Sequence, residues 1–357
     1  MSYNRDVSKG RKKERVSMAI KIKTCYLFVL DNYKCELVRP KHPMDDQKEG
    51  PFEFLRKSIQ KCLKNAAIRP GVFCPESGGR QAFLSYRAHD CSFLEYATEL
   101  AQKRYDHKKE SELEYATDLF VCEVEITQGK DEAAIDGVVG LELTCKEGML
   151  HTVKQGESGI LTNLEPKNSI IPAVTLKNSN FFWINTDDQT VSILENQIHV
   201  NGEPTYPYAE EILGCEMEIS VKEALQTSLE VIREVAEECG LDHLKLVPTM
   251  DRVIKETINE GEDLDLREIA EEVIYEDETA RAQFLKGIEE IGIKKPVKNT
   301  KYVKMPMKKM QKITTDCGIE INIPLDFYTN EEVVKVNRLE DGRLTIEIKN
   351  LNAVENK

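Results

Sequence analysis

The residues whose types and spacing best fit a chemical task are the lysines of one short stretch. Residues 294–312 read KKPVKNTKYVKMPMKKMQK and contain no acidic residue. Ammonium groups gathered in this way bind phosphates, and each contact releases a counterion from DNA, so that binding depends steeply on salt. We expect phosphate binding by the eight lysines of this stretch, called the lysine segment below: Lys294, Lys295, Lys298, Lys301, Lys304, Lys308, Lys309 and Lys312.

The spacing within the lysine segment suggests how it would present its charges. Four lysines lie three or four positions apart, which a helix would align on one side: Lys301, Lys304, Lys308 and Lys312. Pro306 allows only a short helix that begins there, and Tyr302 is expected to stack on a base or sugar. The alternative is an exposed connector between a helix and a sheet, with Val303, Met307 and Met310 turned inward.

A second group of basic residues lies at the start of the chain. Residues 1–16 hold six basic and two acidic side chains. We interpret them as a flexible basic arm, in which Arg11, Lys12 and Lys13 add further candidates for contact with DNA phosphates.

One pair of carboxylates suggests a different chemistry. Asp326 follows Pro324-Leu325, and Glu347 is followed two positions later by Lys349. This order is typical of nucleases in which two carboxylates hold Mg²⁺ and a lysine stabilises charge at the phosphate. Alternation of polar and apolar residues on a strand explains the same residues, because Glu347 and Lys349 would share one strand face. A Mg²⁺-dependent nuclease is therefore the less favoured hypothesis.

Other catalytic and metal-binding templates are not found in the sequence. It has no glycine-rich phosphate loop, no zinc-protease helix motif and no G-x-S-x-G turn. The six histidines are isolated from one another, and the ten cysteines never form a C-x-x-C pair. We expect reduced, largely buried thiols in a reducing compartment, with no catalytic residue, no metal site and no cofactor.

An acidic run precedes the lysine segment. Residues 255–290 contain 13 acids against four bases. Solvated helix faces are the simpler interpretation, and an acidic surface for a basic partner protein is the alternative.

Hydrophobic periodicity predicts an α+β fold with a strand-rich N-terminal part, a helical middle and a C-terminal β-hairpin or small sheet. The expected domains are the arm at 1–16, a strand-rich α+β domain at 17–212, a helical domain with a C-terminal β unit at 213–351, and a tail at 352–357. Capping boxes at Ser92–Glu95 and Ser220–Glu223 predict two helix starts, and Asp265 with Glu268 predicts a similar one. The expected helices cover 51–65, 92–105, 221–239, 266–274 and 278–291, and the principal expected strands cover 118–126, 136–145, 169–176, 181–185, 190–195 and 318–328.

The net charge of the chain limits where a polyanion could touch it. The 357 residues carry a formal charge of −14. The basic arm contributes +4 and the lysine segment +8, which leaves −26 on all other residues. Any DNA contact must therefore be local. No apolar run is long enough to cross a membrane, and the first residues lack the apolar core of a secretory signal.

The C-terminal block resembles the ending of the bacterial nucleoid-associated protein family, the NdpA-like proteins. That family ends in a T-x-x-G-I-E-I-x-[IF]-P strand followed by a D-G-x-x-x-I-x-I-K-N strand. The matching positions are Thr315, Gly318, Ile319, Glu320, Ile321, Pro324, Asp341, Gly342, Ile346, Ile348, Lys349 and Asn350. The segments 264–293 and 137–153 are similar to the helical and central strand regions of the family, so that the resemblance spans about residues 20–351.

The resemblance implies a non-enzymatic cytoplasmic protein that localises with the bacterial chromosome and associates with double-stranded DNA or its attendant proteins. It brings no catalytic residue and no cofactor. Our leading hypothesis is sequence-independent DNA association through the basic segments. The alternatives are an adaptor that a DNA-remodelling protein recruits through the acidic helices, and the nuclease. No membrane contact is expected, and a homo-oligomer remains open.

Overall fold

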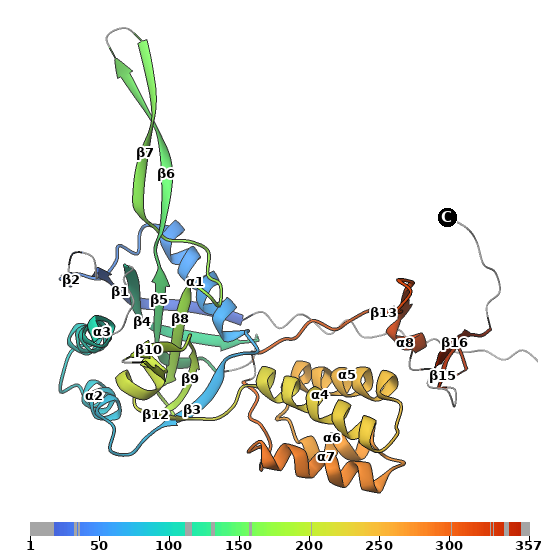
Figure 1. Ribbon diagram of the computed structural model, residues 1–357. Helices are drawn as coiled ribbons and strands as arrows, with labels where there is room; N and C mark the ends of the chain where they lie inside the picture. The colour runs from blue at the N-terminus through green and yellow to red at the C-terminus, as the bar shows by residue number, and fades with distance from the viewer. Residues whose placement is uncertain are drawn as a thin grey trace, which may run out of the picture. The chain divides into compact units, whose positions relative to one another are not determined.

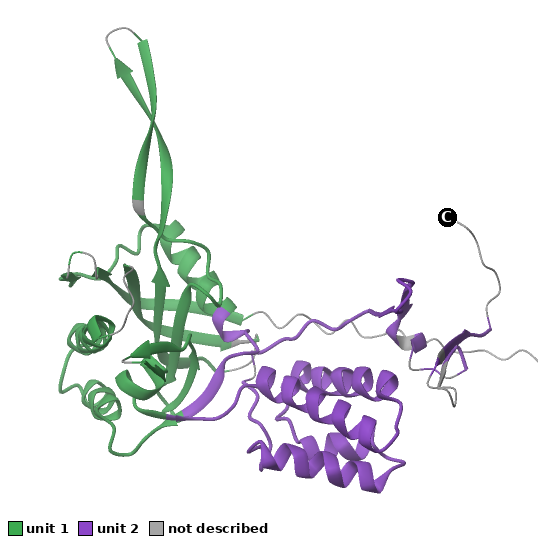
Figure 2. Ribbon diagram, viewed as in Figure 1, with its two compact units in different colours: residues 1–61, 72–215 green, residues 62–71, 216–357 purple. Residues whose placement is uncertain are grey.

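The structure of the protein is a computed structural model with two compact units (Figure 2). Unit 1 comprises residues 1–61 and 72–215, and unit 2 comprises 62–71 and 216–357. The predicted arm and tail lie outside the described residues, and the predicted domain limits stay a prediction. The described residues are 18–31, 34, 36–110, 116–129, 133–156, 159–200, 202–300, 302–328, 330, 332–338 and 343–350.

An eight-stranded sheet forms the centre of the strand-rich part (Figure 1). Its spatial order is β12 (Cys215–Met217), β3 (Arg69–Phe73), β9 (Thr190–Leu194), β8 (Ser179–Asn185), β5 (Ile135–Thr144), β4 (Thr117–Gln128), β1 (Met18–Asp31) and β2 (Glu36–Val38). The neighbours from β9 to β2 pair antiparallel. The expected strands at 118–126, 136–145, 181–185 and 190–195 are thereby confirmed to within a residue or two.

The middle of this sheet is covered on both faces. Residues 137–143 of β5 are all buried, whereas a sheet with one wet face would alternate. Gly140 makes this packing possible, because it stands opposite Phe182 in the register and a Cβ there would lie 2.0 Å from the Phe182 ring. The glycine is therefore needed for the close approach of an aromatic ring.

Among the described residues, three helices and one π-helix accompany this sheet. They are α1 (Glu49–Leu63), α2 (Gly78–Arg87), α3 (Phe93–Glu110) and the π-helix η1 (Pro207–Ile212). The predicted start of α3 is confirmed, since the Glu95 N–H donates to Ser92 Oγ at 3.3 Å and the Ser92 N–H donates to Glu95 Oε2 at 2.7 Å. Helix α3 packs against β1, α2 and η1. Helix α2 was not predicted, although Ser77 caps it.

A fully buried carboxylate, Glu142 of β5, connects the elements around it. Arg104 Nε of α3 lies 2.8 Å from Glu142 Oε2, and both side chains are 1% exposed. Three further donors from β4, β8 and η1 reach the same carboxylate, namely Thr117 at 2.7 Å, Asn180 at 3.1 Å and Tyr208 at 3.0 Å. These hydrogen bonds fasten five elements of unit 1 to one side chain.

A second cation lies beside this carboxylate. Lys108 Nζ donates to Thr117 Oγ1 at 3.0 Å and to the Leu30 carbonyl at 3.2 Å. Burial lowers the pKa of Lys108 to about 8, against the pull of Glu142. The sequence signal of this cluster is Glu142 itself, the single charged residue of the segment 137–144.

Two strands leave the sheet of unit 1 as a long ribbon (Figure 1). Strand β6 (Lys146–Gly156) follows β5 directly and pairs antiparallel with β7 (Gly159–Ile170). A second small pair consists of β10 (Ile198–Val200) and β11 (Glu203–Thr205). The strand predicted at 169–176 is wrong beyond Ile170, because Pro172 has no N–H to donate to a ladder.

Four helices of unit 2 form a bundle (Figure 1). Helix α4 contacts α5 and α7, and α6 contacts the same two helices. The predicted starts of α4 and α6 are confirmed, because Ser220 and Glu223 form the capping box and Asp265 accepts from the Arg267 N–H at 2.9 Å. The four helices are α4 (Val221–Glu238), α5 (His243–Glu260), α6 (Leu266–Val273) and α7 (Glu278–Glu290).

Helix α5 was not predicted, and it contains a proline in its interior. Pro248 has no N–H for the carbonyl of Leu244, four residues earlier, and such a carbonyl needs another donor. The hydroxyl of Tyr328 provides it at 2.6 Å. A residue 84 positions from Leu244 thus completes the hydrogen bonding of the helix, which no local pattern could indicate.

The C-terminal part consists of two hairpins and one helical turn. Strand β13 (Met310–Thr314) pairs with β14 (Glu320–Pro324), α8 (Leu325–Tyr328) follows, and β15 (Val334–Arg338) pairs with β16 (Leu344–Ile348). Ile323, Leu325, Tyr328 and Val334 form their small core. The predicted C-terminal β unit and the α+β class are confirmed. Among the described residues, no helix is long and apolar enough to cross a membrane.

Candidate nucleic-acid interface

The lysine segment runs as an irregular, extended connector from α7 to β13. Its described residues form no helix, so the predicted helical alignment is wrong for Lys304, Lys308 and Lys312, while Lys301 lies outside the described residues. The physical reason is the placement of its apolar side chains. Val297 and Val303 are buried at 4% and 1% exposed. Pro296 and Pro306 also disfavour a continuous helix.

Backbone and side-chain hydrogen bonds fix the same connector to the end of α5 and to the residues that follow it. Val297 exchanges two backbone hydrogen bonds with Leu264, at 2.8 and 3.0 Å. The side chain of Asn259 makes two hydrogen bonds with the backbone of Met305. Its Oδ1 accepts from the Met305 N–H at 2.8 Å, and its Nδ2 donates to the Met305 carbonyl at 2.9 Å. Asn299 donates to the carbonyl of Ile258 at 2.9 Å. The lysines of this stretch are therefore carried on an anchored backbone.

Two expectations about apolar residues of the segment are corrected. Tyr302 is 6% exposed, so its ring is not presented to a base or sugar. Met307 and Met310 are 38% and 45% exposed, so they are not turned inward, whereas Val303 is. The connector interpretation holds for the backbone and for Val303 only.

Four of the lysines have partners within unit 2. Lys295 lies 2.6 Å from Glu218, which raises the lysine pKa, and Lys312 lies 2.6 Å from Glu320. Lys308 lies 3.9 Å from the buried Asp251, and Lys304 donates to the Asn259 carbonyl. None of these partners could be read from the segment itself, since they come from β12, α5 and β14 or their flanks.

Three lysines are exposed and have no acidic partner among the described residues: Lys294, Lys298 and Lys309. They are called the free lysines below, and Lys295, Lys308 and Lys312 the paired lysines. Lys301 of the segment and Arg11, Lys12 and Lys13 of the arm lie outside the described residues.

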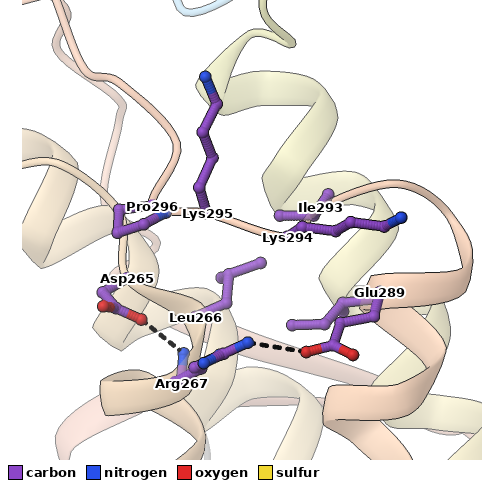
Figure 3. Close-up of a pocket in the computed structure, with 9 residues that line it drawn as sticks. Asp265, Leu266, Arg267, Glu289, Ile293, Lys294, Lys295 and Pro296 are labelled. Atoms are coloured by element: carbon purple, nitrogen blue, oxygen red, sulfur yellow. Dashed lines mark hydrogen bonds and ion pairs between the residues drawn. The ribbon is translucent and has the colours of Figure 1, made fainter.

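A shallow pocket brings two predicted lysines together with an arginine that was not predicted (Figure 3). Arg267 of α6 forms an ion pair with Glu289 of α7 at 2.8 Å, while the side chains of Lys294 and Lys295 point in different directions. In the sequence, Arg267 is marked only by being a single basic residue between the acids Asp265 and Glu268. The lining residues are Asp265, Leu266, Arg267, Ile288, Glu289, Ile293, Lys294, Lys295 and Pro296.

The acidic run covers the outside of α5, α6 and α7. Eleven of its 13 acids are exposed, and the remaining two, Asp265 and Asp277, cap α6 and α7. Solvated helix faces and caps account for these residues, as the simpler interpretation expects.

The described residues give no support to the nuclease hypothesis. Glu347 lies 3.1 Å from Lys349, which is its neighbour on the same strand face. The side chain of Asp326 is not among those described. Within the described residues, no group of three or more His, Cys, Asp or Glu side chains is placed to hold a metal ion.

Comparison with known families places the chain in the class of bacterial nucleoid-associated proteins. The family model described as nucleoid-associated protein YejK matches residues 33–355, which is most of the chain. The chain therefore belongs to this family, and the resemblance stated from its C-terminal motifs is confirmed. No match is found among the curated proteins. Membership assigns a nucleoid-associated role to the protein.

Proposed function

We propose that the protein binds double-stranded DNA directly, through phosphate contacts of the lysine segment and without reading bases. The observation that carries this proposal is the set of free lysines on an anchored backbone. Lys294, Lys298 and Lys309 are exposed and have no acidic partner among the described residues, while buried Val297 and Val303 hold the chain in place. The family assignment to the nucleoid supports it.

The paired lysines add less to this surface, because a phosphate must first displace the carboxylate beside each ammonium group, such as Glu218 or Glu320. Displacing an exposed ion pair costs up to about 1 kcal/mol per lysine. The remainder of the chain carries a formal charge of −26. Its exposed acids repel phosphates that come within the Debye length, which is about 8 Å at physiological ionic strength. We therefore expect contact only at the lysine segment and the basic arm.

The proposal predicts binding that does not depend on DNA sequence. The full chain would be titrated at low salt against two duplexes of equal length and unrelated sequence, with anisotropy as the readout. We expect dissociation constants that agree within about twofold, because phosphate contacts carry no sequence information. A preference of tenfold or more would indicate base reading, since each mismatched base pair costs about 1–3 kcal/mol.

A second candidate function is recruitment through a protein partner. The observation in its favour is the exposure of eleven acids of the run 255–290, which gives a basic DNA-remodelling protein a surface to bind. No binding to either duplex at low salt, together with co-purification of such a partner, would favour the adaptor over direct contact.

The same titrations test the nuclease hypothesis. With Mg²⁺ added, we expect both duplexes to remain intact on a denaturing gel. Cleavage that is lost on replacing Glu347 with alanine would support the nuclease instead.

A further inference from the structure

The β6–β7 ribbon exposes apolar side chains along its whole length. Each strand has a single partner, and neither face of the ribbon is covered by another described element. Seven large apolar side chains on it are between 41% and 69% exposed: Met149, Leu150, Val153, Ile160, Leu161, Leu164 and Ile170. An isolated two-stranded hairpin is marginal in water, and exposed apolar patches mark interaction sites. This ribbon therefore needs a partner surface.

The two faces of the ribbon differ in charge. Directly opposed residues of an antiparallel pair share a face, so the register sorts the side chains. Between residues 149 and 166, one face carries no lysine, arginine or carboxylate, and we call it the uncharged face: Met149, His151, Val153, Gln155, Ile160, Thr162, Leu164 and Pro166. Lys154 and Glu165 lie on the opposite face, where they form an ion pair at 3.6 Å.

We propose that the uncharged face of the ribbon packs against the same face of a second copy of this chain, about a twofold axis. An isologous contact of this kind requires a surface that complements itself. A strip of apolar and neutral side chains meets that requirement, whereas a strip of one charge would repel its copy.

The charge balance favours a second copy over DNA as the occupant. Residues 146–170 contain three lysines and three glutamates, so the ribbon has no net charge in a chain of −14. Two copies repel each other over the rest of their surfaces, and the ribbon is where they approach without that penalty. A duplex needs cations, and the uncharged face offers none.

The size of the face also suits a second copy. Four residues of the face are large and apolar, namely Met149, Val153, Ile160 and Leu164, and side chains of this kind present roughly 60–120 Å² each, or about 240–480 Å² per copy. A specific interface buries about 800 Å² per partner. The apolar side chains thus supply about a third to a half of that area, and the neutral side chains between them extend the contact.

The test is the mass of the full chain in solution, measured by sedimentation equilibrium over a range of concentrations. We expect twice the chain mass of 40.8 kDa for the natural sequence. Leu164→Glu places a charge on the uncharged face and should raise the dissociation constant of the dimer by roughly 100-fold or more. Its matched control is Leu161→Glu on the opposite face, because Leu164 and Leu161 are 63% and 61% exposed.

Folding of each variant is checked by circular dichroism, and Ile160→Glu on the uncharged face should repeat the effect of Leu164→Glu. A monomeric natural chain, equal dissociation by Leu161→Glu, or an unchanged dimer with Leu164→Glu would each overturn the proposal. So would a Leu164→Glu variant that loses DNA affinity while keeping its mass, because the ribbon would then be a DNA surface.

Discussion

Glu142→Gln is expected to destabilise the protein by about 3–5 kcal/mol, the usual cost of breaking a buried ion pair by removing one partner. The variant keeps the size of the side chain but leaves the Arg104 guanidinium buried without its carboxylate, 2.8 Å away in the natural protein. Urea unfolding followed by fluorescence of Trp183, which lies in the neighbouring strand β8, measures the loss. We expect a lower midpoint with an unchanged slope.

The matched control is Glu289→Gln on the surface of unit 2. Its ion pair with Arg267 has the same separation of 2.8 Å, but the two side chains are 62% and 47% exposed rather than 1%. An exposed pair contributes about 0–1 kcal/mol. If Glu142→Gln cost no more than Glu289→Gln, the network around Glu142 would not be what holds unit 1 together.

The pH dependence of stability gives a second signature of Glu142. Burial raises the pKa of this carboxyl, but Arg104 and Lys108 outweigh burial and hold it at about 2, below the ordinary 4.5. Its stabilisation is therefore complete above about pH 4.5 and is lost as the pH falls toward 2, by about 3 kcal/mol. The difference between the natural protein and Glu142→Gln should shrink on acidification through this window.

A second carboxylate, the half-buried Glu195, titrates in a separate window with the opposite sign. Burial raises the pKa of Glu195 to about 7, against hydrogen bonds from the Tyr208 and Ala209 N–H groups. The unfolded chain ionises this carboxyl at a lower pH than the folded protein does. The free energy of unfolding therefore falls as the pH rises from about 4.5 to about 7. Of these two carboxyls, only Glu142 therefore changes the free energy of unfolding below pH 4.5.

Replacing all three free lysines with glutamine is expected to weaken DNA binding by roughly 10- to 100-fold at 0.1 M salt, equally for unrelated duplexes. Each of Lys294, Lys298 and Lys309 should contribute one phosphate contact, so that the slope of log K against log[salt] becomes less negative by about 2.7. Fluorescence anisotropy at four salt concentrations measures both quantities.

The paired lysines provide a control with the same change in net charge. Replacing Lys295, Lys308 and Lys312 with glutamine removes three ammonium groups whose charge is already partly compensated by Glu218, Asp251 and Glu320. We expect a smaller loss of affinity from this triple variant. Equal losses would mean that total charge, rather than the arrangement of the segment, determines binding.

The elements predicted correctly from the sequence are those with a local cause. The capping boxes at Ser92 and Ser220 place a hydroxyl and a carboxylate three residues apart, so each helix start is complete within one turn. The lysine segment was also found by composition alone. Its conformation was not, because Val297 and Val303 become buried only when the end of α5 lies beside them.

The missing parts of the prediction depend on residues far apart in the chain. Helix α5 holds Pro248, which discourages a helix until the Tyr328 hydroxyl reaches the Leu244 carbonyl. The network around Glu142 gathers donors from α3, β4, β8 and η1. The acids beside the paired lysines arrive in the same way. Which lysines keep an uncompensated charge is thus a property of the fold.

The most direct test of the account is the salt dependence of DNA binding by the natural full-length chain. If the lysine segment contacts phosphates directly, log K falls linearly with log[salt], with a slope between about −3 for the free lysines alone and about −7 for all eight lysines. A slope near zero, or no binding at the lowest salt, would contradict direct contact by these lysines.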